Sequence, residues 1–400
     1  MSFDTLLATR TRAMDASAVR EILRVVSRPG MISLAGGLPA PEAFPLDIMP
    51  MLIHTVLEKY AYRAFQYDLS EGFTPLRVAL ADYLHQRDGI KVAADKILIG
   101  SGSQGILDGL GKILISPGDP VALEAPTYLG AIQALNPYEP QYIHVETDDQ
   151  GVIPDALESV LQRSRVKFVY LVPTFQNPTG RTIPLIRRKQ IAGIIKKYNT
   201  LLIEDDPYSC LRYQGRAIPS IYTMAPENVV YLSTLSKVFA PGLRIGFCIA
   251  PEPVRQWLVT ARQGVDLHTG TFNQALAAEY IEGGHLERHL PKIVSFYAPR
   301  KQAMITALDN YFPPDFKWSR PDGGMFVWLQ GPRKIDMQKI YFQAIEQNVA
   351  FVPGRFFFTR KGEGHETARL NFTLADESTI TRAISILASV IKRYEKGGDK

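Results

Sequence analysis

Short apolar runs alternate with longer stretches of helical periodicity in the middle of the sequence, and this alternation constrains the fold more than any other feature. The runs are rich in β-branched residues and end at Gly, Pro or Asp, which is typical of buried strands. Continuous apolar strands separated by helices are typical of a mostly parallel sheet covered on both faces, so the sequence predicts an α/β fold. The predicted strands are Lys96–Gly100, Pro120–Leu123, Phe168–Val172, Leu201–Glu204, Val229–Leu232 and Ile245–Ala250, and the predicted helices between them are Gly105–Ile115, Leu185–Tyr198 and Phe272–Ile281.

The pattern changes after two consecutive glycines near residue 284. A long helical stretch over His285–Tyr311 is followed by a short apolar run, Met325–Leu329, and by a final helical stretch, Glu377–Tyr394. This combination indicates a second, smaller α+β unit. The N-terminal residues are rich in turn formers and cannot form a core alone, so we expect them to pack on the small domain or on a partner subunit. The predicted units are an N-terminal segment (1–47), a large domain (48–290) and a small domain (291–400).

Composition argues against several classes of protein. The chain has 400 residues, with 45 Lys and Arg against 40 Asp and Glu, and the net charge of +5 is spread along its length. Because there is no basic block, we expect no binding to nucleic acid. No stretch approaches the roughly 20 apolar residues that span a bilayer, so we expect no membrane contact. Two cysteines are too few for a disulfide framework, and no signal peptide is recognisable, so we expect a cytoplasmic protein.

Lys237 is the most informative single residue. It lies between two predicted core strands, in a run where Thr234 and Ser236 precede it and Arg244 begins the next strand. An ammonium group is costly in such surroundings unless it has a covalent or ionic role. Desolvation favours the neutral amine, which suits Schiff-base chemistry. A solvated loop lysine is the alternative.

Three further segments supply groups that such a lysine needs. One strand ends in the acids of Glu204–Tyr208, and another ends in the Asn-Pro turn of Pro173–Gly180. Ligands bind at the carboxyl ends of strands in open α/β sheets. The segment Ile99–Gly105 joins a strand to a helix through small residues whose N–H groups can hold a phosphate. Turns of this kind are common, so by itself the segment could equally be a dinucleotide loop or a plain tight turn. Its glycines fall one residue short of the G-x-G-x-x-G spacing.

Together, these four features resemble the class I and II aminotransferases of fold type I, which depend on pyridoxal 5′-phosphate. The resemblance extends over essentially all of the chain and is greatest to the branch of the 2-aminoadipate and kynurenine aminotransferases. It implies a large domain with a mostly parallel seven-stranded sheet, a smaller α+β domain, and a homodimer with shared active sites. The segments that carry it are Ser33–Pro39, Phe65–Tyr67, Gln176–Gly180, Glu204–Tyr208, Ser236–Arg244 and Arg262–Thr269.

The resemblance assigns roles around the cofactor. Lys237 would form the Schiff base and act as the catalytic base. Asp205 would pair with the pyridine nitrogen and keep it protonated; its spacing of three from Tyr208, rather than any property of Glu204 or Asp206, selects it. The remaining cofactor contacts implied are Asn177 and Tyr208 to the phenolic oxygen, Tyr128 stacked on the ring, and Ser103, Gln104, Thr234, Ser236, Arg244 and the other subunit's Tyr67 to the phosphate.

The resemblance also implies how an amino acid binds. Arg369 would hold the α-carboxylate with its planar fork, beside Asn177; a surface ion pair is the alternative for this arginine. In the N-terminal segment, Ser17 and Arg20 lie three apart on one face of an expected helix, near the backbone of Gly37. They could read the distal carboxylate of glutamate or 2-aminoadipate, or Arg20 could simply pair with a neighbouring acid.

The predicted activity is transfer of an amino group from an L-amino acid to a 2-oxo acid such as 2-oxoglutarate. The expected donors are 2-aminoadipate, glutamate, and aromatic or branched-chain amino acids. The main alternative is a lyase or decarboxylase that uses the same cofactor and the same lysine. A regulator that senses the cofactor is less expected, because the family match begins within the first twenty residues, and a NAD-dependent dehydrogenase lacks its glycine spacing. We expect no metal, since His285 and His289 suggest no third ligand.

Overall fold

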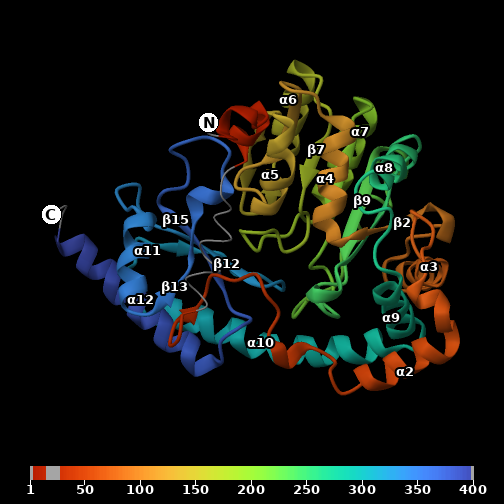
Figure 1. Ribbon diagram of the computed structural model, residues 1–400. Coiled ribbons are helices and arrows are strands. Elements are labelled where there is room, and N and C mark those ends of the chain that lie inside the picture. Colours follow the sequence, from red (N-terminus) through yellow and green to blue (C-terminus); the bar gives the residue numbers. More distant parts are fainter. Residues whose placement is uncertain (1–2, 15–27, 398–400) are drawn as a thin grey trace.

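The computed structural model describes residues 3–14 and 28–397, and two sheets organise them (Figure 1). The larger sheet has seven strands and forms the predicted α/β core. In spatial order they are β2 (Ile97–Ser101), β10 (Ile245–Ile249), β9 (Val229–Thr234), β8 (Leu202–Asp205), β7 (Val169–Leu171), β3 (Pro120–Glu124) and β4 (Gln141–Val145). Only β10 runs antiparallel to its neighbours, and the other pairs are parallel. The prediction of a mostly parallel sheet is therefore confirmed.

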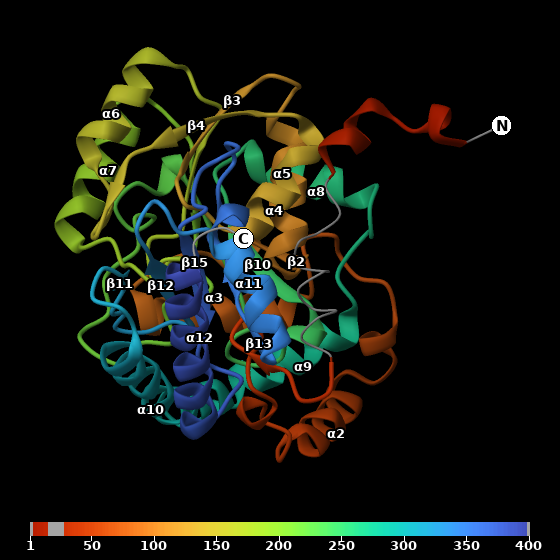
Figure 2. The same ribbon diagram turned by 90° about the vertical axis from the view of Figure 1, so that its left-hand side faces the viewer.

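Helices cover both faces of this sheet, as a buried parallel sheet requires. Along β3, Val121 and Leu123 belong to one apolar cluster, while Ala122 between them belongs to the cluster on the other face. Figure 2 shows α6 and α7 on one side of the strands and α4 and α5 on the other. The helices of this part are α2 (Met49–Tyr60), α3 (Thr74–Asp88), α4 (Gly102–Leu114), α5 (Leu129–Leu135), α6 (Pro154–Arg163), α7 (Leu185–Lys197), α8 (Val254–Gln263) and α9 (Thr271–Glu282).

A second, four-stranded antiparallel sheet lies in the C-terminal part of the chain. Its strands, in spatial order, are β11 (Lys317–Trp318), β12 (Phe326–Gln330), β15 (Thr367–Asn371) and β14 (Val352–Pro353). The helices α11 (Met337–Glu346) and α12 (Glu377–Gly397) contribute side chains to its apolar cluster. The N-terminal strand β1 (Ile32–Ser33) pairs in parallel with β13 (Val349–Ala350), so the segment around residue 33 is attached to this part of the molecule.

One long helix, α10 (His285–Tyr311), joins the two parts. Leu286, Ile293 and Tyr297 pack in the cluster of the large sheet, whereas Met304 and Leu308 pack in the cluster of the small sheet. The helix therefore runs through residue 290, where we predict the domain boundary, and that boundary stays a prediction. In the described residues no helix is long and apolar enough to cross a membrane.

Candidate active site

A cavity of about 410 Å³ opens at the carboxyl ends of β7, β8 and β9 and faces the small sheet. Most of the residues predicted for the site line it, although they come from distant parts of the sequence. They are Gly37, Ser103, Gln104, Tyr128, Asn177, Asp205, Tyr208, Thr234, Ser236, Lys237, Arg244 and Arg369. Three are not placed there: Ser17 and Arg20 lie outside the described residues, and Tyr67 is 77% exposed with its ring against His268.

Lys237 follows β9 and points its amine into the cavity, where Nζ donates to the carbonyl oxygen of Gly37 at 2.8 Å. Desolvation by the surrounding protein lowers the pKa of Lys237 to about 8, and the positive charges of Arg369 and Arg244 act in the same direction. A substantial fraction of this amine is therefore neutral near pH 8, as a nucleophile and a base must be.

The three consecutive acids at the end of β8 have different partners. Glu204 accepts from the backbone N–H groups of Ile221 and Tyr222, and Asp206 accepts from Ser209 N–H and Tyr231 OH. Both carboxylates are thus used to hold neighbouring segments in place.

Asp205 differs from its neighbours because one of its oxygens is unused. Its side chain is 1% exposed, Oδ2 accepts from Tyr170 OH at 2.6 Å, and Oδ1 is buried with no partner among the described residues. Burial raises the pKa of Asp205 to about 7, against the effect of the Tyr170 hydrogen bond, and Asp206 raises it further. A buried carboxylate oxygen without a partner is unfavourable unless a ligand donates to it.

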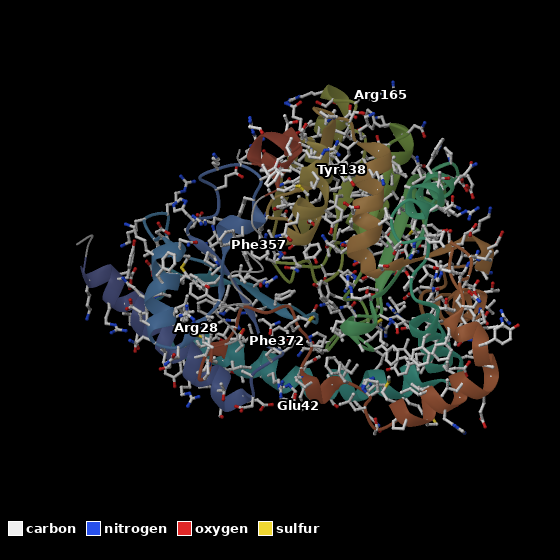
Figure 3. The ribbon with its side chains drawn as sticks, viewed as in Figure 1. Arg28, Glu42, Tyr138, Arg165, Phe357 and Phe372 are labelled. Carbon is white, nitrogen blue, oxygen red and sulfur yellow. The ribbon has the colours of Figure 1, made fainter. Side chains whose placement is uncertain are left out.

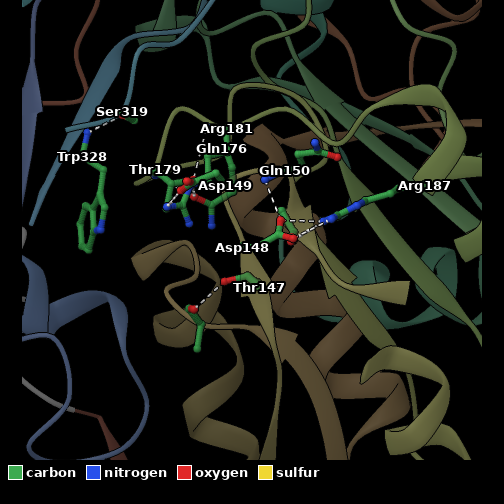
Figure 4. Close-up of polar contacts among 12 residues, drawn as sticks. Thr147, Asp148, Asp149, Gln150, Gln176, Thr179, Arg181, Arg187, Ser319 and Trp328 are labelled. Carbon is green, nitrogen blue, oxygen red and sulfur yellow. Dashed lines mark hydrogen bonds and ion pairs between the residues drawn. The ribbon is translucent and has the colours of Figure 1, made fainter. Parts of the chain in front are cut away.

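Asn177 connects two other residues of the cavity, Tyr208 and Arg369. Its Nδ2 donates to Tyr208 OH at 3.2 Å, and its Oδ1 accepts from Arg369 Nη1 at 2.9 Å. The preceding Gln176 fixes the turn, since its Nε2 donates to the carbonyl of Pro126 and its Oε1 accepts from both N–H and Oγ1 of Thr179 (Figure 4). The side chain of Asn177 is therefore held in a fixed position by its own turn.

Arg369 stands on β15 and is buried. Its Nη2 donates to the carbonyl of Ala35 at 2.7 Å, and its guanidinium lies 4.2 Å from the ring centre of Phe326 and 5.1 Å from that of Phe357. Its Nε has no hydrogen-bond partner among the described residues. Figure 3 labels Phe357, which lies where the small sheet faces the large one. Desolvation lowers the pKa of Arg369 to about 10, so the group remains charged at neutral pH. It forms no ion pair with any described residue, and an incoming carboxylate can take this role.

The other end of the cavity has the donors of an anion site. Ser103 and Gln104 lie in the first turn of α4, whose N–H groups have no acceptor within the helix. Arg244 reaches this turn, and Gly102 leaves room for it: a Cβ on Gly102, whose φ is +72°, would lie 2.4 Å from Arg244 Nη2. The side-chain amide of Gln104 donates one N–H to the carbonyl of Gly130 at 2.7 Å, which leaves its second N–H and its backbone N–H for an anion.

Hydroxyl groups and an aromatic ring complete this end. The Oγ atoms of Thr234 and Ser236 are 2.9 Å apart and both residues line the cavity. Tyr128 also lines the cavity, and Gly130 accommodates its ring, because a Cβ there would lie 2.4 Å from Tyr128 Cζ. Burial raises the pKa of Tyr128 to about 12, so the phenol is neutral at physiological pH.

Sequence reasoning missed the contribution of Tyr170. It is fully buried in the middle of β7, and its hydroxyl is the only side-chain donor to Asp205 among the described residues. A polar aromatic residue within an otherwise aliphatic strand, Val169–Leu171, was the available signal, but such a tyrosine usually serves packing alone.

A second, larger cavity of about 640 Å³ lies beyond Gly180 and contains none of the predicted residues. We call it the outer crevice; it is bordered by the loop around Arg181 and by β11 and β12. Arg181 pairs with Asp149 at 2.6 Å, and Ser319 Oγ accepts from Trp328 N–H at 2.9 Å, as Figure 4 shows. Arg320 also lines the outer crevice and forms an ion pair with Asp309.

Known proteins resemble this chain over its whole length. The family model for class I and II aminotransferases matches residues 56–387. The aromatic-amino-acid aminotransferase 1 of Thermococcus litoralis is 43% identical over 402 residues, which are 99% of this chain and 96% of that protein. The kynurenine aminotransferase of Pyrococcus horikoshii, solved with PMP, has a TM-score of 0.94 at 43% identity and covers 100% of this chain and 99% of its own. The α-aminoadipate aminotransferase of Thermus thermophilus, solved with N-(5′-phosphopyridoxyl)-L-leucine, has a TM-score of 0.92 at 37% identity and covers 100% of both chains.

Proposed function

Because the chain belongs to the class I and II aminotransferases, in the branch of the aromatic, 2-aminoadipate and kynurenine enzymes, we propose that it transfers amino groups from several L-amino acids to 2-oxoglutarate. The proposed donors are glutamate, 2-aminoadipate, and the aromatic and branched-chain amino acids. The observation that carries this choice is the buried Arg369, which has an unused Nε and faces a cavity whose side-chain end is lined by Leu38, Leu129 and Val352. Such a site fixes the α-carboxylate tightly and admits apolar side chains of different size.

The cavity fits pyridoxal 5′-phosphate, the cofactor of this family. The unpaired Oδ1 of Asp205 suits a protonated ring nitrogen, and the first turn of α4 with Arg244, Thr234 and Ser236 suits a phosphate. The amine of Lys237 lies in the same cavity. When bound, the cofactor supplies an aldehyde that combines with amines and a ring that accepts electrons.

In the proposed mechanism the chain orients the substrate and moves its proton. Arg369 binds the α-carboxylate, and Asn177 holds the guanidinium in place through Nη1. With substrate bound, Lys237 would take the proton from the substrate Cα and deliver it to the aldehyde-derived carbon of the cofactor, and in the second half-reaction it would move a proton in the reverse direction. The lowered pKa of Lys237 leaves a substantial fraction of its amine neutral near pH 8, as removal of a proton requires. Gly37 lines the same cavity, and a Cβ there would lie 3.3 Å from the Phe326 ring.

We further propose the homodimer implied by the family resemblance. Tyr62, Phe65, Tyr67 and Leu69 are exposed large side chains in one short segment, and clusters of this kind are typical of interfaces. In the dimer, Tyr67 would reach the partner's phosphate site. Mixing inactive Tyr67→Ala and Lys237→Ala subunits should restore activity, since each heterodimer has one intact site; no recovery after demonstrated subunit exchange would contradict sharing.

The two-domain division at residue 290 and the cytoplasmic location also remain proposals. The two apolar clusters support the division, although α10 contributes to both. Both cysteines, Cys210 and Cys248, are free thiols, in keeping with a reducing compartment.

A half-reaction screen tests the proposed donors. Purified holoenzyme is mixed with one amino acid at a time, and loss of the visible absorption of the bound cofactor is followed. Glutamate, 2-aminoadipate, phenylalanine and leucine should each bleach it and release the matching 2-oxo acid, and 2-oxoglutarate should restore it. Release of carbon dioxide, or bleaching by none of these donors, would contradict the proposal. Lys237→Ala is the matched control and should show no absorption change.

A further inference from the structure

We propose that Tyr170 is a positioning residue that favours the ionised form of the cofactor-facing carboxylate of Asp205, an inference that rests on the proposed function. Tyr170 and Asp205 come from neighbouring parallel strands, β7 and β8, in which Tyr170 is level with Ile203. The phenol hydrogen bonds to Oδ2 at 2.6 Å, and the two side chains are 0% and 1% exposed. The carboxylate therefore has a fixed donor on one oxygen and a free position on the other.

Most of the surroundings of Asp205 oppose its ionisation, and the Tyr170 hydrogen bond favours it. Burial is the largest cause of its raised pKa, and the adjacent Asp206 adds a negative charge. Tyr128 and Tyr208 also face it, but burial raises the pKa of each phenol, so they bring no charge at neutral pH. The Tyr170 hydrogen bond is the only interaction among these that lowers the pKa of Asp205.

Tyr170 itself is suited to act as a permanent donor. Burial raises its pKa well above the usual value, so it does not lose its proton under physiological conditions. Glu124, which lies nearby at the end of β3, has its pKa raised to about 8 by burial and is mostly neutral at pH 7. Glu124 accepts from the backbone N–H of Val172, whereas the Tyr170 hydroxyl donates its hydrogen bond to Asp205 Oδ2.

The consequence concerns the proton between Asp205 Oδ1 and the ring nitrogen of the bound cofactor. A donor on Oδ2 makes the carboxylate less basic, so this proton stays on the nitrogen. Without the donor, the carboxylate becomes more basic and takes the proton back, and the ring loses the positive charge that lets it accept electrons. Removal of a hydrogen bond to a charged group corresponds to roughly a ten- to hundredfold change in such an equilibrium.

The test is Tyr170→Phe, with Tyr231→Phe as the matched control. Tyr231 lies on β9, next to β8, is 1% exposed, and donates to Asp206 Oδ2 at 3.1 Å, so its replacement removes the same group from the same core but not from Asp205. Each holoenzyme is prepared with pyridoxal 5′-phosphate labelled with ¹⁵N in the ring, and the nitrogen chemical shift is recorded from pH 6 to 9. Wild type and Tyr231→Phe should show a protonated ring nitrogen, whereas Tyr170→Phe should shift toward the unprotonated value and lose roughly ten- to a hundredfold in kcat.

A graded variant covers the case in which Tyr170→Phe folds poorly. Incorporation of 3-fluorotyrosine at position 170 makes a stronger donor of nearly the same shape, and in a titration extended beyond pH 9 it should raise the pH at which the ring nitrogen loses its proton above the wild-type value. An unchanged signal in Tyr170→Phe, an equal change in Tyr231→Phe, or no response to fluorination would overturn the role of Tyr170. Failure of the proposed function looks different: the wild-type protein would then fail to transfer amino groups, whatever the state of the ring nitrogen.

Discussion

Two cavities that border the small sheet differ both in size and in how completely their charged groups are paired. The outer crevice is the larger, about 640 Å³ against about 410 Å³, yet its arginines, Arg181 and Arg320, are paired with acids of the same chain. The smaller cavity contains charged groups that are buried and incompletely paired, at Asp205 Oδ1 and Arg369 Nε. Burial of an unpaired charged group is unfavourable, so it persists where a ligand supplies the missing partner. Between these two cavities, incompletely paired charge distinguishes the predicted site, and open volume does not.

The largest effect that this comparison predicts is that of Lys237→Ala. Without the amine, the cofactor cannot be held covalently and no group in the cavity can replace the base, so turnover should fall by roughly three orders of magnitude or more. Purified wild type should be yellow and the variant should lack that absorption. Borohydride reduction and peptide mapping should label Lys237; a label on another lysine would exclude this assignment.

The next effect separates the adjacent acids of β8. Asp205→Asn should leave the cofactor bound, because the phosphate site is intact, but reduce kcat by roughly a hundredfold or more, because the ring nitrogen loses its anionic partner. Asp206→Asn should be much milder, since Asp206 serves to bind Ser209 and Tyr231. Cofactor content and kcat are measured on both variants. The reverse order of activities would show that Asp206 faces the ring.

Substitution of an arginine in each cavity sharpens the comparison directly. Arg369→Ala removes the charged partner of the α-carboxylate and should lower kcat/KM by roughly ten- to a hundredfold for every donor, mainly through KM. Arg320→Ala in the outer crevice removes an exposed pair with Asp309 and should change kcat/KM little. Equal losses in the two variants would mean that the crevice also takes part in substrate binding.

The sequence predicts the fold where a strand is apolar on both faces. The predicted bounds of β8 and β10 lie within one residue of the observed ones, because Ile245–Ile249 is an apolar run and the apolar start of Leu202–Asp205 is followed by acids at the strand end. β4 was missed because it is the edge strand of the large sheet: Gln141 is exposed and His144 partly so, and its polar residues hide the strand pattern.

For the site, the sequence indicated which residues come together but not how they are paired. The positions of Asn177, Asp205, Lys237 and Arg369 follow from motifs at strand ends. The Tyr170 hydroxyl could not be assigned, because strand register decides whether a buried tyrosine meets an acid. Tyr67 is exposed in one chain, so its role depends on a second subunit and stays a prediction.

The smallest predicted effect concerns stability, and it tests whether the buried amine of Lys237 destabilises the cofactor-free protein. Because desolvation lowers the pKa of Lys237 to about 8 in the folded chain, the folded state binds fewer protons than the unfolded state between about pH 8 and the ordinary pKa of lysine, 10.5. Charged Lys237 therefore destabilises the fold below pH 8, and this penalty disappears as the pH rises toward 10.5. In the cofactor-free protein, Lys237→Met should raise the free energy of unfolding by roughly 1–2 kcal/mol at pH 7, after allowance for partial exposure of the side chain.

The same gain should vanish near pH 10.5. Lys317→Met is the control, since Lys317 is exposed in the outer crevice and its loss should leave stability unchanged at both pH values. Urea unfolding of the three cofactor-free proteins at pH 7 and pH 10.5 measures the difference. A stability gain for Lys237→Met that is independent of pH would come from added apolar packing, and it would show that the amine is well solvated. A gain confined to the lower pH would show that burial of the Lys237 amine lowers the stability of the cofactor-free protein. The amine of Lys317 in the outer crevice is exposed and has no such effect.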